Sequence, residues 1–193
     1  MITCGIDASS SCTGLCLFDN FTLVYYNKFR PDKDLGFRSN TCQIIEKIAP
    51  IIDKYKPAKI YMEDVPQFAK QGSRGKNMLK PIIALGAVQG IFYHKICFEM
   101  GYSIEYVNVD EWRQELGFLK GNERKREEQK QKAIDYVNRE FNLDLQFKKG
   151  SHRISNDDDI AEAIAICWSQ IKVEATNELA HAMSIGRSAK WKR

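Results

Sequence analysis

The alternation of apolar and polar positions predicts strands at the start and in the middle of the chain. Asp19 and Asn20 form a turn-forming pair, so the second and third strands should make an antiparallel hairpin. Later strands separated by helical segments should run parallel to the first. The five predicted strands cover residues 2–8, 13–19, 22–30, 58–64 and 102–109.

Helical spacing of apolar residues appears between and after these strands. Isoleucines recur at helical spacing over 39–55, where Pro50 should end or bend the helix. Further helices are predicted over 78–100, up to Phe141, and from 157 onward. This order predicts an α/β fold with a five-stranded mixed sheet, three antiparallel strands then parallel strands, flanked by helices. The predicted domain organisation is one domain, 1–185, followed by a basic C-terminal tail, 186–193.

Carboxylates stand at the ends of two predicted strands and on one predicted helix. Asp7 ends the first strand and Glu63 the fourth, so the two should emerge at one sheet edge if these strands are neighbours. Asp159 and Glu162 are three residues apart, hence on one helical face. Such carboxylates destabilise the fold unless a cation neutralises them, and oxygen ligands suit Mg²⁺ or Mn²⁺.

Alternatives remain open for the acidic helix start. Asp157, Asp158 and Asp159 could instead cap the helix and interact with its dipole, and Asp158 could replace Asp159 as the ligand. Three alanines, at 161, 163 and 165, should let this helix approach the sheet closely.

Composition narrows the function classes. The chain has 193 residues, 44% hydrophobic and 28% charged, which is typical of a globular domain. No apolar run approaches the ~18 residues of a membrane span, and no targeting segment opens the chain, so we expect a cytoplasmic protein without a membrane partner. Six cysteines without a CxxC pair predict reduced thiols. The net charge of +4 permits an anionic partner.

Four sequence motifs together resemble the RuvC-type Holliday junction resolvases, and most closely the divergent phage- and poxvirus-borne members. In order, they are Gly5-Ile-Asp7-Ala-Ser-Ser-Ser-Cys-Thr-Gly14, Tyr61-Met-Glu63, Leu85-Gly86-Ala-Val-Gln89-Gly90 and Asp159-Ile-Ala-Glu162. The resemblance implies a ribonuclease-H-like fold. It also implies a crossover junction endodeoxyribonuclease that resolves four-way and other branched DNA by paired symmetric hydrolysis, with two Mg²⁺ or Mn²⁺ ions per site.

The same resemblance implies roles for individual residues. Asp7, Glu63, Asp159 and Glu162 would be catalytic metal ligands, and Lys130 would be the catalytic lysine at the cleaved phosphate, with Lys125 as the alternative. DNA contacts are expected from Phe68, Lys70, Arg74, Lys76, Lys125 and Lys130. The chain departs from the bacterial pattern: Ala8-Ser9 follows the first aspartate instead of Pro-Gly, and Glu162 replaces the usual aspartate. Pro66 stands at the position of the aromatic wedge, so Phe68 is the nearest candidate ring.

A homodimer is also expected. In the resolvases that this chain resembles, the helix after the glutamate strand forms the dimer interface. Here that helix is 78–100, and its apolar residues spread too widely around it to face a single core. The polar, basic segment 66–77 should be a surface loop, with both copies on the same face of the dimer.

Rival functions come from other classes. The first motif is similar to the phosphate loop of sugar and acetate kinases, but those enzymes need a duplicated domain of about twice this length. A non-catalytic nucleic-acid-binding module would be expected to lack one of the carboxylates. A related nuclease acting on RNA or an RNA–DNA hybrid would use the same residues and stays open.

Overall fold

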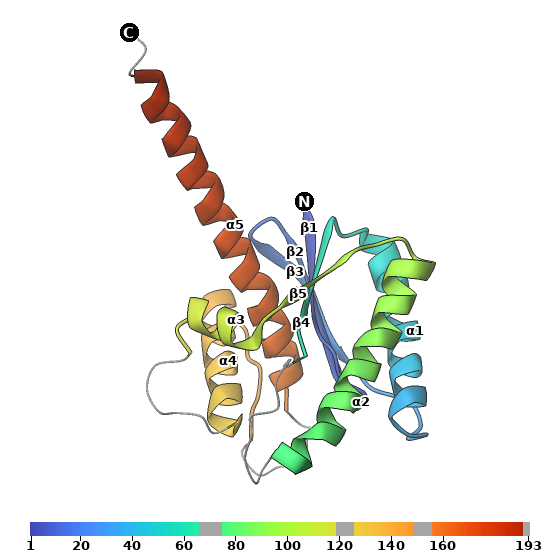
Figure 1. Cartoon of the computed structure of the whole chain (residues 1–193). Helices are drawn as coiled ribbons and strands as arrows, with labels where there is room; N and C mark the ends of the chain where they lie inside the picture. The colour runs from blue at the N-terminus through green and yellow to red at the C-terminus, as the bar shows by residue number, and fades with distance from the viewer. Residues whose placement is uncertain (66–74, 119–125, 149–155, 191–193) are drawn as a thin grey trace.

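A five-stranded sheet lies between two groups of helices in the computed structural model, which describes residues 1–65, 75–118, 126–148 and 156–190 (Figure 1). The strands are β1 (Ile2–Asp7), β2 (Thr13–Asp19), β3 (Thr22–Phe29), β4 (Lys59–Glu63) and β5 (Ile104–Val107), in the order β3-β2-β1-β4-β5. Pairing is antiparallel between β1, β2 and β3, and parallel between β1, β4 and β5. The predicted mixed sheet is therefore confirmed, including the β2–β3 hairpin and the β1–β4 neighbours.

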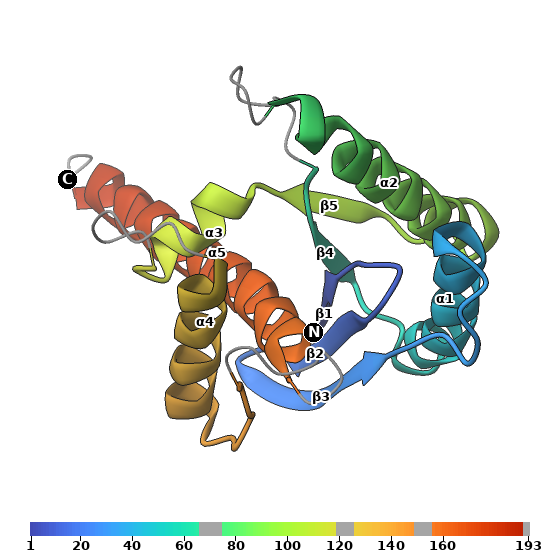
Figure 2. The ribbon, with the colours of Figure 1, turned by 90° about the horizontal axis from the view of Figure 1, so that it is seen from below.

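The helices cover the two faces of the sheet. One face carries α1 (Phe37–Tyr55), α2 (Gly75–Tyr93) and the π-helical segment η1 (His94–Glu99). The other carries α3 (Val109–Glu115), α4 (Arg126–Phe141) and α5 (Asp158–Lys190) (Figure 2). Each side has its own apolar core, because the inner strands are buried on both faces and alternate side chains point to opposite sides.

Two local features differ from what the sequence indicated. Of the two outcomes predicted for Pro50, an end or a bend, the end does not occur, because α1 continues to Tyr55. Pro50 is exposed while its neighbours Ile48 and Ile52 are fully buried, so core packing outweighs the backbone hydrogen bond that proline removes. The short helix α3 was not predicted at all; Asn108 caps it by accepting a hydrogen bond from the Asp110 amide at 2.8 Å.

No apolar run was expected to approach the ~18 residues of a membrane span, yet one helix in the described part of the chain passes a test of length and mean hydropathy. Residues Pro81–Glu99 are helical, long enough and apolar enough to pass that test. Only 22% of the stretch is buried in the chain. A single helix of this kind is weak evidence for a membrane, and the cytoplasmic location stays a prediction.

The helix α5 lies unusually close to the sheet, and this contact positions the site. A Cβ atom placed on Gly14 of β2 would lie 1.8 Å from the Asp159 carbonyl oxygen, and one on Gly5 of β1 would lie 2.4 Å from the Ala163 carbonyl oxygen. Only glycine leaves room at these two points. The three alanines predicted to allow close approach, at 161, 163 and 165, are fully buried, which confirms that expectation.

Beyond the sheet, α5 continues as a long helix toward the C-terminus (Figure 1). It runs through residue 186, where the basic tail was predicted to begin, and residues 191–193 lie outside the described part. The division into a domain, 1–185, and a tail, 186–193, stays a prediction.

Candidate active site

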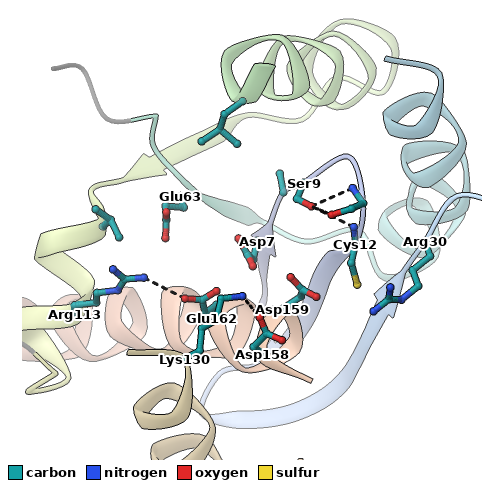
Figure 3. A pocket seen from close by; sticks show the side chains of 14 residues that line it. Asp7, Ser9, Cys12, Arg30, Glu63, Arg113, Lys130, Asp158, Asp159 and Glu162 are labelled. Carbon is teal, nitrogen blue, oxygen red and sulfur yellow. Dashed lines mark hydrogen bonds and ion pairs between the residues drawn. The ribbon is translucent and has the colours of Figure 1, made fainter. Parts of the chain in front are cut away.

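A cavity of about 470 Å³ opens where β1 and β4 end. Carboxylates enter it from the sheet and from the first turns of α5, while basic side chains enter from α3, α4 and the residue that follows β3 (Figure 3). Its charged lining residues are Asp7, Arg30, Glu63, Arg113, Lys130, Asp158, Asp159 and Glu162. The structure thus brings together the five residues for which a catalytic role was predicted.

Strand pairing places the first two carboxylates side by side. In the parallel β1–β4 ladder Ile6 faces Met62, so Asp7 and Glu63 follow as the next residues at the same sheet edge. On the other side of β1, Asp7 faces Gly14, against which the Asp159 backbone of α5 packs. Glu162 is one helical turn further along and buried.

The electrostatics show that these groups share one environment. Burial raises the pKa of the Asp7 carboxyl well above its ordinary range, and the nearby charges of Glu162, Asp159 and Glu63 raise it further. Lys130 acts in the opposite direction. The largest of these charge effects come from Glu162, Asp159 and Glu63, while the Asp158 carboxylate forms an ion pair with Lys130. These observations favour Asp159 over Asp158 as the member of the cluster.

Two further residues of the site were missed from the sequence. The indole N–H of Trp112 donates to Glu63 Oε2 at 3.1 Å, and Arg113 Nη2 donates to Glu162 Oε1 at 3.1 Å. Both belong to α3, directly after β5. The sequence could have indicated that these two residues lie near the site. They follow β5, which is parallel to β4, so the end of β5 must reach the same sheet edge as Glu63.

The loop between β1 and β2 forms another side of the cavity. Ser9 Oγ accepts hydrogen bonds from the amides of Ser11 and Cys12, both at 3.2 Å, and so holds the loop in place. Burial, together with the Asp159 carboxylate, raises the pKa of the Cys12 thiol to about 12. That thiol therefore stays protonated at neutral pH.

Most of the predicted DNA contacts fall outside the described residues. This applies to Phe68, Lys70, Arg74 and Lys125, while Lys76 lies in the first turn of α2 without a described side chain. Lys130 is described: it lies on α4 and lines the cavity.

The ligand atoms that the four predicted carboxylates offer are of the type that a hard divalent cation prefers. All four predicted ligands offer carboxylate oxygens. Burial, and then the neighbouring carboxylates, raise the pKa of Asp7, and a divalent cation would neutralise the charge of those carboxylates. Within the described ranges, no three His, Cys, Asp or Glu side chains are gathered tightly enough to hold an ion as they stand. Glu63 and Glu162 are instead held by donors of the protein itself.

Comparison with known proteins supports the fold. No protein-family model and no curated protein sequence matches the chain. Among solved structures, Thermus thermophilus RuvC in complex with a Holliday junction substrate has a TM-score of 0.58 and 18% identity, covering 91% of this chain and 96% of RuvC. Thermus thermophilus RuvC in a second structure has a TM-score of 0.53 and 17% identity, covering 91% and 97%.

The fowlpox virus Holliday junction resolvase has a TM-score of only 0.47 at 16% identity, covering 90% of this chain and 99% of its own. The predicted likeness to poxvirus-borne members therefore stays a prediction. The RuvC neighbours confirm the ribonuclease-H-like fold predicted from the motifs.

Proposed function

We propose that this protein is a divalent-metal-dependent endodeoxyribonuclease that resolves four-way DNA junctions by paired, symmetric hydrolysis. The observation that carries the proposal is the convergence of Asp7, Glu63, Asp159 and Glu162 in one cavity. Support also comes from the fold, which is that of a RuvC solved with a Holliday junction and which extends over 91% of this chain.

The carboxylates would divide the work of holding Mg²⁺ or Mn²⁺. Asp7 lies between the other ligands, so it would contact two ions, with Glu63 on one side and the α5 carboxylates on the other. Bound ions would activate water and stabilise the leaving oxygen of a phosphodiester. Lys130, which already moderates the charge of Asp7, would lie close to the phosphate that is cut.

Phosphate and base contacts would come from the two basic segments. We propose that the segment 66–77, with Phe68, Lys70, Arg74 and Lys76, and the helix start around Lys125 and Lys130 bind the arms of the junction. Such contacts are electrostatic, so binding should weaken with salt.

Paired cuts require two sites, and a homodimer supplies them. The helical stretch of α2 and η1 buries Val88, Phe92 and Ile96 against the sheet. On its outer side Ile83 and Phe98 remain 68% and 74% exposed. Because one helical stretch carries apolar residues on both sides, we propose that a second copy of this chain covers the outer one.

The test is parallel digestion of a four-way DNA junction, a linear duplex and an RNA–DNA hybrid. With Mg²⁺, the protein should cut the junction at symmetric positions, and Asp7→Asn should abolish cutting while junction binding persists. Asp53→Asn, which changes an exposed carboxylate on α1, is the matched control and should cut normally.

Metal dependence is tested in the same assay. Excess chelator should stop cleavage, and Ca²⁺ should support binding better than cutting. Preferred cutting of the hybrid would favour the ribonuclease alternative. Normal junction cutting by a folded Asp7→Asn protein would refute the carboxylate mechanism.

A further inference from the structure

Helix α3 places two consecutive residues against two different carboxylates of the cavity. The Trp112 side chain is fully buried, and its ring meets Phe118 edge-on with centroids 5.8 Å apart. This packing fixes the indole, whose N–H donates to Glu63 Oε2 at 3.1 Å. The orientation of Glu63 is therefore coupled to the apolar core beneath α3.

The neighbouring Arg113 reaches the opposite side of the cluster. Its guanidinium carbon lies 4.9 Å from the centroid of the Trp112 ring, and Nη2 donates to Glu162 Oε1 at 3.1 Å. The two side chains of this ion pair are only 22% and 11% exposed. The buried Arg113 Nε has no hydrogen-bond partner within the described ranges.

We propose that Trp112 and Arg113 are positioning residues of the metal site: Trp112 orients Glu63, and Arg113 is a built-in cation that occupies Glu162 until a divalent ion replaces it. This inference rests on the proposed function. It explains why the carboxylates line one cavity without being gathered tightly enough for an ion. The two roles are separable, since the residues bond to carboxylates on different elements.

The replacement follows from simple competition. Arg113 occupies Glu162 Oε1, so a divalent ion that takes this oxygen, alone or together with Oε2, must first displace the guanidinium. The apparent metal affinity is then reduced by the fraction of molecules in which Glu162 is released. Removing the guanidinium should remove this competition, whereas a lysine at the same place should largely retain it.

Manganese binding to the 193-residue protein tests the inference without any cleavage reaction. Free Mn²⁺ has a six-line electron paramagnetic resonance signal that is lost on binding, so titration gives the dissociation constant directly. Arg113→Gln should bind Mn²⁺ about five- to tenfold more tightly than the wild type, and Arg113→Lys should stay within about twofold. Trp112→Phe, which keeps a buried ring but removes the N–H donor, should bind about tenfold more weakly.

A second variant separates direct competition for Glu162 from the general effect of positive charge in the cavity on metal binding. Arg30 lines the same cavity from the end of β3, across from Arg113 (Figure 3). Arg30→Gln removes the same charge, so equal tightening by Arg30→Gln and Arg113→Gln would overturn the role of Arg113. Unchanged or weaker binding by Arg113→Gln would do the same, and unchanged binding by folded Trp112→Phe would overturn the role of Trp112.

The failure of this inference is distinguishable from failure of the proposed function. If the wild type binds Mn²⁺ and cuts junctions but the variants bind Mn²⁺ as the wild type does, only the positioning roles of Trp112 and Arg113 are refuted. If the wild type neither binds Mn²⁺ nor cuts junctions, both the positioning roles and the proposed nuclease function are refuted. Circular dichroism of each variant before titration shows whether it is folded.

Discussion

Replacing Gly14 by alanine should displace the α5 carboxylates from Asp7. The new Cβ would lie 1.8 Å from the carbonyl oxygen of Asp159 and 2.4 Å from its carbonyl carbon. Ordinary van der Waals contact begins at 3.4 Å, so the start of α5 must retreat by about 1.6 Å along the line of closest contact. Both colliding atoms belong to the backbone, so no side-chain rotation can relieve the overlap.

The magnitude follows from two opposing effects. Alanine stabilises a strand relative to glycine by roughly 0.5–1 kcal/mol, whereas overpacking of a close-packed interior destabilises by about 1–3 kcal/mol or more. Overpacking should win, with a net loss of about 1–2 kcal/mol, equivalent to about 2–8 °C in Tm for a chain of this size. The rate of junction cleavage should be affected more strongly than the free energy of unfolding. A displacement of about 1 Å at a reacting centre can lower a reaction rate about 100-fold.

Thermal melting and junction cleavage of the same preparations provide the assay. Asp53→Asn, which changes an exposed carboxylate on α1, is the control. It should be as stable as the wild type. A Gly14→Ala protein with wild-type Tm and wild-type cleavage would refute the claim that this contact positions Asp159.

Three other predictions test the charge of the site, the docking of α5 and the dimer. The raised pKa of Asp7 means that the folded protein binds this proton more tightly than the unfolded chain, so without metal stability should rise as pH falls through that raised pKa toward the ordinary range of an aspartate. In chelator at neutral pH Asp7→Asn should therefore melt higher than the wild type, and an equal gap in acid would contradict this. The Tyr61 hydroxyl donates to Glu174 of α5, so Tyr61→Phe should lower the free energy of unfolding in urea by about 1 kcal/mol; no change would argue against that bond. Sedimentation should give twice 22.2 kDa for the wild type and 22.2 kDa for Phe98→Glu, with exposed Leu179→Glu as the dimeric control; a monomeric wild type would exclude paired cutting by a dimer.

The sequence alone predicted the order of strands, the mixed sheet and the four carboxylates. These features depend on patterns that are local or repeat at a fixed spacing. Alternation marks the strands, and the place of Asp7 and Glu63 at strand ends determines the edge on which they emerge. The spacing of Asp159 and Glu162 places them on one helical face whatever the rest of the chain does.

Tertiary structure decided which neighbours act on those carboxylates. Arg113 and Glu162 are 49 residues apart in sequence and belong to different elements. The same separation, again between two elements, holds for Trp112 and Glu63. No periodic sequence pattern predicts such a contact, because the contact depends on where β5 and the following turn position α3. Gly14 is likewise ordinary in sequence and becomes critical only because the Asp159 backbone packs onto it.

Helix α1 also shows the difference between what the local sequence predicts and what tertiary packing decides. Local propensity at Pro50 predicted that the helix ends or bends there, yet the helix does not end, because Ile48 and Ile52 are buried in the core under it. Patterns along the chain therefore determined which residues face inward and which carboxylates reach the sheet edge. Packing between distant elements decided how closely α5 approaches and which donors hold the site, because those energies arise only between surfaces that the fold brings into contact.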